Sequence, residues 1–292
     1  MNGIVLIDKP SGCTSHDVVN RWRRLAKTKR AGHLGTLDPM ATGLLVLVTG
    51  TATRLAQFYG GNDKTYEAEM RLGAVSDTFD ADGNVMPTNR PIPGREDVIE
   101  ALAAFRGTIM QTPPSVSAKK INGVPAYKLA RKQQPVVLAP VEVEVKQLDV
   151  REIAGEMLRL TVTCSAGTYI RAIAHELGEK LGCGAILTSL RRTRSGEFDV
   201  AGSWTFDRLE RLSESASLEQ AVIPPAKLLS EFPCVRVDEI GEMRVRQGRE
   251  FRASPFVVRP GAPFVKAISS SGDLIAIGQL KFPNVYHPMM VF

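Results

Sequence analysis

The pattern of apolar and polar positions predicts strands and helices from the start of the chain. Residues 3–8 and 44–48 are short apolar runs of the kind found in buried strands. Between them, apolar residues recur on one face of a helix that Thr14 or Ser15 caps. Residues 64–72 alternate between apolar and polar side chains, which is the period of a strand with one buried face.

The middle of the chain continues this mixture of strands and helices. Apolar spacing predicts a helix over 96–105, two strands over 141–150 and 157–164, and a second helix opened by residues 167–171. The apolar run 185–190 predicts one more strand, which three arginines follow.

The last third of the chain changes character. The Ser-rich segment 213–225 is interpreted as a helix that ends at two prolines. From residue 231 onward, short strands are broken by Gly and Pro, which predicts a small β-barrel of about 60 residues. We therefore predict an α+β fold with one domain over 1–228 and a second over 231–292. The loop over 111–135 is expected to be functional, because loops of this length are uncommon in compact domains.

A glycine-rich segment before the second apolar run is the most unusual part of the chain. Residues 30–49 contain three glycines, and Pro39 directly follows Asp38. Glycine permits backbone angles that other residues resist and proline fixes its own φ, so this is a shaped loop. A lone carboxylate in a rigid turn beside a core strand is costly unless the site uses it. Asp-Pro also opens ordinary turns, so this segment alone leaves both a catalytic and a structural role for Asp38 open.

The distribution of charge points to a polyanionic partner. The chain of 292 residues carries a net charge of +6, from 37 Lys and Arg against 31 Asp and Glu. Residues 1–60 hold eight basic and three acidic side chains, so nearly all of the excess surrounds the glycine-rich segment. A basic field beside a candidate site suits nucleic acid, although a solvated helix face would give the same count.

Several functional classes lack support in the sequence. No stretch approaches the roughly 18 apolar residues of a membrane span, and the first residues do not form a secretory signal. The four cysteines are scattered without a CxxC pair, which argues against zinc or disulfides and suits the cytoplasm. The carboxylates of residues 77–83 lack the terminal Glu of a calcium loop. The chain has no P-loop and no GxGxxG pattern. We therefore expect a cytoplasmic protein without metal, cofactor or membrane.

Six side chains stand out for their chemistry, and only the fold could bring them together. They are Lys9, His33, Asp38, Tyr66, Asp80 and Arg171. The set offers a carboxylate with nucleophile or base potential, a cation to keep it ionised, and two rings able to stack on a base. Arg171 lies in the first turn of its predicted helix, where cations are disfavoured, so a nearby carboxylate is expected.

The sequence resembles the bacterial tRNA pseudouridine synthases of the TruB type. The resemblance rests on motifs that recur in the family's order: IDKP (7–10), GHLGTLDPMATGLL (32–45), KTYEAEMRLG with DTFDADG (64–83), CSAGTYIRAIAHELGEKLGCGA (164–185) and LRR (190–192). The tail resembles the family's RNA-binding PUA module. The resemblance implies the pseudouridine-synthase fold, a mixed and mainly antiparallel sheet flanked by helices, with a PUA-like barrel after it.

The resemblance also implies a reaction and a catalytic set. The reaction is isomerisation of uridine 55 in the T-arm of tRNA to pseudouridine, on a flipped-out base and without a cofactor. Asp38 would be the catalytic carboxylate, as nucleophile or base. Arg171 would pair with Asp38 and keep it charged. Tyr66 would pack on the flipped base and assist proton transfer.

Further residues are implied to bind the substrate. His33 would stack where the target base leaves its loop, and Leu190 would line the pocket. Lys9 and Asp80 would support the edge of the pocket. The basic loop 111–135 adds candidate phosphate contacts, among them Lys119 and Lys120.

Two other classes of protein remain as alternatives. A non-enzymatic RNA-binding or RNA-folding protein could use the same scaffold, although intact Asp38, Tyr66 and Arg171 favour an enzyme. A nucleobase deaminase or glycosylase is less well supported, because the zinc ligands of a deaminase are missing. The protein is expected to act as a monomer on tRNA.

Overall fold

The computed structural model describes residues 1–117, 119–121, 123–125, 138–259 and 261–292. Its largest element is a nine-stranded sheet with the order β1-β3-β12-β4-β11-β10-β7, in which β2 pairs with β3 and β13 with β12. The strands are β1 (Gly3–Lys9), β2 (Ala31–His33), β3 (Thr42–Thr49), β4 (Lys64–Leu72), β7 (Gly107–Gln111), β10 (Val141–Ala154), β11 (Met157–Cys164), β12 (Ala185–Ser195) and β13 (Phe198–Asp199). Only β3 and β12 run parallel in this sheet.

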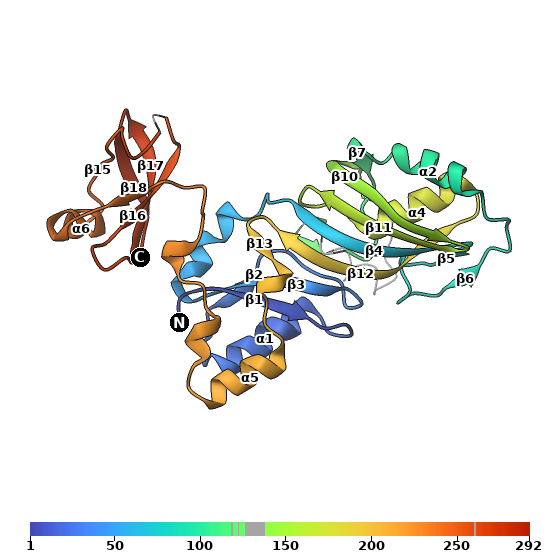
Figure 1. Cartoon of the computed structure of the whole chain (residues 1–292), viewed down its shortest axis with the longest axis horizontal. Coiled ribbons are helices and arrows are strands. Elements are labelled where there is room, and N and C mark those ends of the chain that lie inside the picture. The colour runs from blue at the N-terminus through green and yellow to red at the C-terminus, as the bar shows by residue number, and fades with distance from the viewer. Residues whose placement is uncertain (118, 122, 126–137, 260) are drawn as a thin grey trace.

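Among the described residues, four α-helices pack against this sheet, two toward each end of it (Figure 1). They are α1 (Ser15–Leu25) and α5 (Phe206–Glu214) toward the end that holds β1, and α2 (Arg95–Ala103) and α4 (Ile170–Leu181) toward the other end, where α2 contacts β10 and α4 contacts β12 and β4. Helix α1 begins where predicted, because Thr14 and Asp17 form a capping box. The expected α+β class with a mainly antiparallel sheet is confirmed.

Shorter elements connect these parts. They are η1 (Gly50–Phe58), β5 (Ala74–Val75), β6 (Met86–Pro87), β8 (Lys120–Ile121), β9 (Val124–Pro125), η2 (Val200–Gly202), η3 (Leu218–Ala221) and η4 (Pro225–Lys227). Strands β8 and β9 pair with each other and belong to the predicted loop 111–135. Part of that loop lies outside the described residues.

Two sequence-based predictions were wrong. The segment 213–225 is not one helix: the helix is α5, which ends at Glu214, and short 3-10 turns follow it. The apolar residues that anchor α5 are Phe206 and Leu209, ahead of the Ser-rich stretch. The predicted strand 185–190 also continues to Ser195, because residues 191–195 still pair with β4.

The C-terminal part forms a second, five-stranded sheet at one end of the molecule (Figure 1). Its elements are β14 (Cys234–Arg236), α6 (Glu239–Arg246), β15 (Phe251–Arg252), β16 (Phe264–Ile268), β17 (Leu274–Phe282) and β18 (Val285–Val291). The order is β14-β16-β17-β18-β15, and the described residues show no pairing between the edge strands β14 and β15. The strand-rich prediction for this region is therefore right, while a PUA-like identity and the domain boundaries stay predictions.

A shared apolar cluster joins the two sheets. Ile268, Ile277 and Met290 of the C-terminal sheet belong to the same buried cluster as Leu44 and Val46 of β3. The cluster also includes Ala52 and Leu55 of η1, and the ring centroids of Phe58 and Phe264 lie 5.4 Å apart, so the C-terminal sheet contacts η1, the element that follows β3. No helix of the described residues is long and apolar enough to cross a membrane.

Candidate active site

A cavity of about 270 Å³ opens beside the glycine-rich loop. Its lining brings together four of the residues singled out in the sequence: Asp38, Tyr66, Arg171 and Leu190. They come from four separate elements: the loop between β2 and β3, strand β4, helix α4 and strand β12. The fold therefore gathers the predicted catalytic set at one place, although no two of its members are close in sequence.

Asp38 and Arg171 form an ion pair at this cavity. The Nη2 atom of Arg171 donates to Oδ1 of Asp38 at 3.3 Å, and Nε lies 3.2 Å from Oδ2. The side chain of Arg171 is 5% exposed and that of Asp38 is 35% exposed, so the carboxylate can reach a ligand while its partner cannot. This pair also accounts for a cation in the first turn of α4, because the carboxylate offsets the unfavourable helix dipole.

Asp80 holds Arg171 from the other side. Its Oδ2 lies 3.6 Å from Nη1 of Arg171, and its side chain is only 6% exposed. Thr78 Oγ1 donates to Asp80 Oδ1 at 2.5 Å, and the backbone N–H of Asp82 donates to the same oxygen at 3.1 Å. Asp80 is therefore engaged with Arg171 and its own loop. This geometry does not support direct substrate binding by Asp80; it makes Asp80 a positioning residue.

Backbone carbonyls complete the surroundings of the guanidinium. Arg171 Nη2 donates to the carbonyl of Val116 at 2.7 Å, and Nη1 donates to that of Thr78 at 3.4 Å. The guanidinium therefore links α4 to three loops: the Asp38 loop, the Asp80 loop and the start of the 111–135 segment. A planar group with diverging donors is suited to this task.

The pKa of Asp38 reflects its surroundings. Burial raises the pKa of this carboxyl above its ordinary value, Arg171 and Lys9 oppose the rise, and the carboxylates of Asp80 and Asp82 add to it. Arg171 favours the charged form of Asp38, as predicted, but burial disfavours that form more strongly. A carboxylate in this state is poised for proton transfer or nucleophilic attack.

Tyr66 and Leu190 provide the apolar wall of the cavity. Both are buried, with 8% and 7% of their surface exposed, and both line the cavity. Burial raises the pKa of the Tyr66 phenol, so the group stays protonated near neutral pH. A neutral ring with a hydroxyl can stack on a planar base and still donate or accept a hydrogen bond.

Lys9 does not have the role predicted for it. Its side chain is fully buried, and Nζ donates to the carbonyls of Pro10, Pro39 and Ala41 at 3.0, 3.1 and 2.6 Å. An ammonium has three donors, so none is left for a substrate. The prediction of direct substrate contact is wrong, because Lys9 holds the backbone of the Asp38 loop.

The other predicted binding residues lie at or beyond the edge of the site. His33 ends β2, is partly exposed and is not among the residues that line the cavity, so stacking on the leaving base stays a prediction. Lys119 is half-buried, and the backbone of Lys120 lies in β8. The side chain of Lys120 lies outside the described part of the structure.

Two cations of the site were missed by the sequence analysis. Arg192 and Lys64 line the cavity, and both are buried. Lys64 opens a strand whose alternation was predicted, and its position on the buried face could have indicated it. Arg192 lies in the LRR motif that carries part of the resemblance, but its partners are backbone carbonyls far along the chain, which no local pattern shows.

Comparison with protein families identifies the family of this chain. A model described as "TruB family pseudouridylate synthase (N terminal domain)" matches residues 23–170, and one described as "tRNA pseudouridylate synthase B C-terminal domain" matches residues 171–230. The chain belongs to the TruB family. The resemblance stated from the sequence motifs is thereby confirmed.

Individual members of the TruB family match most or all of the chain. A tRNA pseudouridine synthase B of Solibacter usitatus (strain Ellin6076) is 50% identical over 294 residues, covering 100% of both chains. A second tRNA pseudouridine synthase B, of Azoarcus sp. (strain BH72), is 43% identical over 86% of this chain and 84% of its own.

Solved structures agree with this assignment. A chain in the structure of an H/ACA RNP bound to a substrate RNA containing 2′-deoxyuridine matches with a TM-score of 0.73 and 25% identity, over 99% of this chain and 84% of its own. A chain in a Cbf5-Nop10-Gar1 complex matches with a TM-score of 0.71 and 26% identity, over the same shares of the two chains. The similarity thus extends over both sheets of this TruB-family protein.

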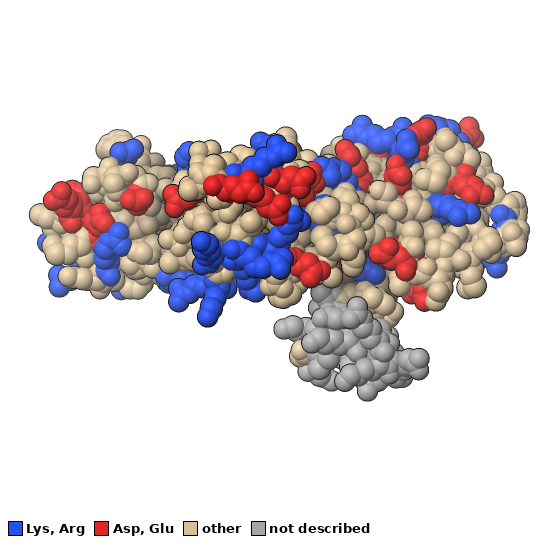
Figure 2. Space-filling model, turned by 90° about the horizontal axis from the view of Figure 1, so that it is seen from below, with Lys and Arg blue, Asp and Glu red and all other residues tan. Residues whose placement is uncertain are grey.

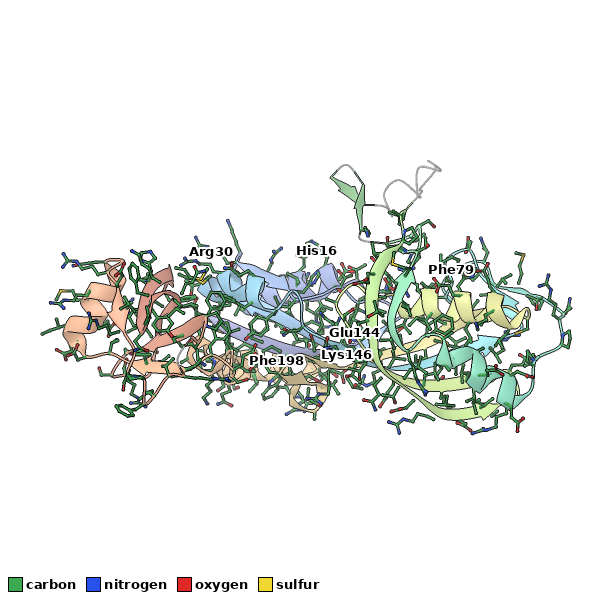
Figure 3. All side chains as sticks on the ribbon, turned by 90° about the horizontal axis from the view of Figure 1, so that it is seen from above. His16, Arg30, Phe79, Glu144, Lys146 and Phe198 are labelled. Carbon is green, nitrogen blue, oxygen red and sulfur yellow. The ribbon has the colours of Figure 1, made fainter. Side chains whose placement is uncertain are left out.

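A basic surface lies on one side of the molecule. Seen from below, the molecule shows Lys and Arg gathered in one large patch beside a band of Asp and Glu (Figure 2). Helix α1 lies on this side, and its end and the turn after it expose Arg24, Lys27, Lys29 and Arg30. Seen from above, Arg30, His16 and Phe79 lie along the edge from which β8 and β9 project (Figure 3).

Not every predicted cation of α1 is available to a ligand. Arg21 donates to Glu210 at 2.6 Å and lies over the ring of Phe206. Arg23 donates to the carbonyl of Ala31 at 2.7 Å. The two side chains therefore stabilise the fold of this TruB-family protein, and the surface charge comes from the four exposed residues that follow them.

Proposed function

We propose that this protein is a tRNA pseudouridine synthase that isomerises uridine 55 in the T-arm of tRNA. The observation that carries the proposal is the partly exposed Asp38 carboxylate, paired with buried Arg171 at a cavity that Tyr66 also lines. The TruB-family relatives named above, which are described as tRNA pseudouridine synthases, support the substrate class.

The reaction requires few groups, and this site has them. The N1–C1′ bond of the nucleotide breaks, the uracil turns, and a C5–C1′ bond forms, while a proton leaves C5 and N1 gains one. No atom is gained or lost overall and no electron is transferred. An ionised Asp38 can add to the substrate or accept the C5 proton, and either role places the carboxylate in contact with the reacting atoms.

The cavity suits a base taken out of its stack. A nucleotide in a folded RNA loop must be extruded before an enzyme can reach its glycosidic bond. The ring of Tyr66 and the side chain of Leu190 offer apolar surface to the faces of the base, while Asp38 lies at the rim of the same cavity. The exposed cations at the end of α1 would contact phosphates around it. We expect the protein to work on tRNA as a monomer in the cytoplasm.

The test is direct. A tRNA transcript is incubated with the protein, and pseudouridine is mapped at single-nucleotide resolution. We expect the product at position 55 and none in a transcript that carries cytidine there. The Asp38→Asn variant should bind tRNA with nearly unchanged affinity and form no pseudouridine. Product at another position, or a comparable rate with Asp38→Asn, would refute the proposal.

A further inference from the structure

The backbone of the Asp38 loop is fixed along its whole length. Each of the seven consecutive carbonyls from residue 35 to residue 41 accepts a hydrogen bond. The donors are Arg192 for Gly35 and Thr36, Ser15 for Leu37, Ala41 N–H for Asp38, Lys9 and Gly12 N–H for Pro39, Ser11 for Met40, and Lys9 for Ala41. Loops rarely have every carbonyl paired within the protein, so this loop is held in one shape.

Arg192 supplies an unusual share of these contacts. Nη2 donates to Gly35 O at 3.1 Å and Nη1 to Thr36 O at 3.4 Å, before Asp38. Nε donates to Leu44 O at 2.7 Å, after Asp38. One guanidinium therefore ties the entry of the loop to its exit.

The backbone of β12 reinforces this arrangement. Arg192 pairs with Gly43 in the short parallel contact between β12 and β3. A Cβ atom at Gly43 would lie 2.3 Å from the carbonyl oxygen of Arg192, and the φ angle of Gly43 is +92°. Only glycine permits this close approach, so the strand that carries Arg192 lies directly against the end of the loop.

The chemistry of Arg192 indicates a purpose other than stability. Its side chain is 1% exposed, and no carboxylate of the described residues lies within 4.0 Å of its guanidinium. Burying a cation without a counter-ion is costly, and an apolar side chain of similar size usually stabilises a fold at least as well. The planar fork instead reaches carbonyls in different directions, which a lysine ammonium at a single point does not.

We propose that Arg192 is a positioning residue for the reaction: it fixes the Asp38 loop so that the carboxylate points into the cavity. It acts through the carbonyls of Gly35, Thr36 and Leu44 and makes no contact with Asp38. Arg192 is also the residue of β12 that pairs with Tyr66 of β4. It therefore fixes the Asp38 loop and the base-stacking wall of the cavity relative to each other. The catalytic part of this inference rests on the proposed function.

The test compares Arg192→Lys and Arg192→Gln with a matched control, Arg194→Gln. Arg194 lies two residues further along β12. Its side chain is 61% exposed, and its Nε lies 3.9 Å from Oδ2 of Asp199. Hydrogen exchange is measured on the free protein at two amides of the loop: Leu37 N–H, which donates to Oγ of Ser15 in α1 at 2.9 Å, and Ala41 N–H, which donates to the carbonyl of Asp38 at 3.1 Å. Single-turnover rate at saturating tRNA and tRNA affinity are measured on the same samples.

We expect both Arg192 variants to exchange at least about tenfold faster at these two amides, while Arg194→Gln matches wild type. The saturated rate should fall at least about tenfold in Arg192→Lys and further in Arg192→Gln, with tRNA affinity within about threefold of wild type. In Arg192→Ala, added guanidinium ion should restore part of the rate, and methylammonium should restore less. A residue that only stabilised the fold would show no such preference.

The outcomes separate this inference from the proposed function. Unchanged exchange in both Arg192 variants would overturn it whether or not pseudouridine forms. Faster exchange with an unchanged saturated rate would also overturn it, because the loop would then not need this support. If wild type formed no pseudouridine, the proposed function would fail, and the exchange comparison would still decide whether Arg192 fixes the loop. If Arg192→Gln did not fold, Arg192→Lys keeps the charge and gives the same comparison.

Discussion

Gln111 and Tyr169 exchange two hydrogen bonds. The N–H of Tyr169 donates to Oε1 of Gln111 at 2.8 Å, and Nε2 of Gln111 donates to the carbonyl of Tyr169 at 3.1 Å. Gln111 is fully buried, and Tyr169 is the residue that precedes helix α4. Because Arg171 lies in the first turn of α4, this side-chain amide fixes the point from which the guanidinium reaches Asp38.

The Gln111→Leu variant should therefore weaken both the fold and the site. Replacing the amide leaves the N–H of Tyr169 without its acceptor, which costs about 1–3 kcal/mol for an unsatisfied buried group, whereas the carbonyl still accepts from the N–H groups of Ala172 and Ile173. We expect a lower midpoint of thermal unfolding and a saturated rate reduced by about tenfold, because Arg171 is no longer held in register. Gln111→Glu keeps the acceptor and serves as the partial control. A normal rate in Gln111→Leu would show that the helix start needs no such support.

Arg171→Lys tests the ion pair at the centre of the site. Lysine keeps the charge but cannot reach Asp38, Asp80 and the carbonyl of Val116 together, as the guanidinium does. We expect the saturated rate to fall by about a hundredfold or more and tRNA affinity to change by less than about threefold. Equal losses in rate and affinity would instead indicate that Arg171 serves binding.

The pH dependence of the reaction should show the raised pKa of Asp38. The reacting form is the carboxylate, so the saturated rate should fall on acidification at a pH above that of an ordinary aspartate. The carboxylate of Asp82 adds to this rise, so Asp82→Asn should move the acidic limb to lower pH, most clearly at low salt. Asp207→Asn, an exposed change on α5, should leave the limb in place. A limb that moved upward in Asp82→Asn would contradict this assignment.

The same shift has a consequence for stability. A folded-state pKa above the unfolded value means that the protonated Asp38 carboxyl favours folding. This contribution is fully present below the unfolded pKa and is lost as the pH rises through the folded pKa. Asp38→Asn should therefore flatten the pH dependence of the free energy of unfolding in that acidic window, as measured by denaturant titration.

The basic surface can be tested by its response to salt. Arg24, Lys27, Lys29 and Arg30 are exposed, so replacing them together by Gln should weaken tRNA binding and flatten its log–log salt dependence. Each lost phosphate contact reduces the slope by about 0.7–0.9. Arg21→Gln is the control, because Arg21 is engaged with Glu210. The rate at saturating tRNA should stay near that of wild type. An unchanged slope in the fourfold variant would mean that these cations are only a solvated face.

The sequence predicted those parts of the fold that depend on local patterns. The alternation over 64–72 gave β4 with its observed bounds, and Thr14 gave the start of α1. Helix α5 was predicted too far along the chain. The burial of Phe206 and Leu209, which precede the Ser-rich stretch, anchors the helix. Boundaries of this kind depend on what a segment packs against, which a single sequence does not display.

The residues of the candidate site also fall into those that the sequence indicated and those that it did not. Asp38, Tyr66 and Arg171 were found because their residue types are unusual in their segments and match a family's motifs. Lys9 was assigned to the substrate because the resemblance implied it, yet its donors are engaged with carbonyls up to 32 positions away. Arg192 was missed for the complementary reason: an arginine in a strand looks exposed, and its partners are backbone atoms distant in sequence.

The apolar cluster shared by the two sheets predicts that the C-terminal sheet supports the strand behind the site. Ile277 and Ile275 lie on the same strand, β17, and both are fully buried. Ile277 belongs to the cluster shared with Leu44 and Val46 of β3, whereas Ile275 belongs to the separate core of the C-terminal sheet. The two positions thus separate support of the neighbouring sheet from stability of the C-terminal part itself.

Ile277→Ala and Ile275→Ala should each destabilise the protein by about 2–5 kcal/mol, since each leaves a cavity in a packed core. Only Ile277→Ala should also increase hydrogen exchange in β1 and β3, because only that change disturbs the apolar cluster to which buried residues of these strands belong. The saturated rate should then fall more in Ile277→Ala than in Ile275→Ala, measured well below both unfolding midpoints. If hydrogen exchange in β3 and the saturated rate were the same in both variants, the C-terminal sheet would be an independent unit with no part in holding the Asp38 loop. If Ile277→Ala loosened β3 and slowed turnover, Leu44 would link the two sheets through the carbonyl that Arg192 holds.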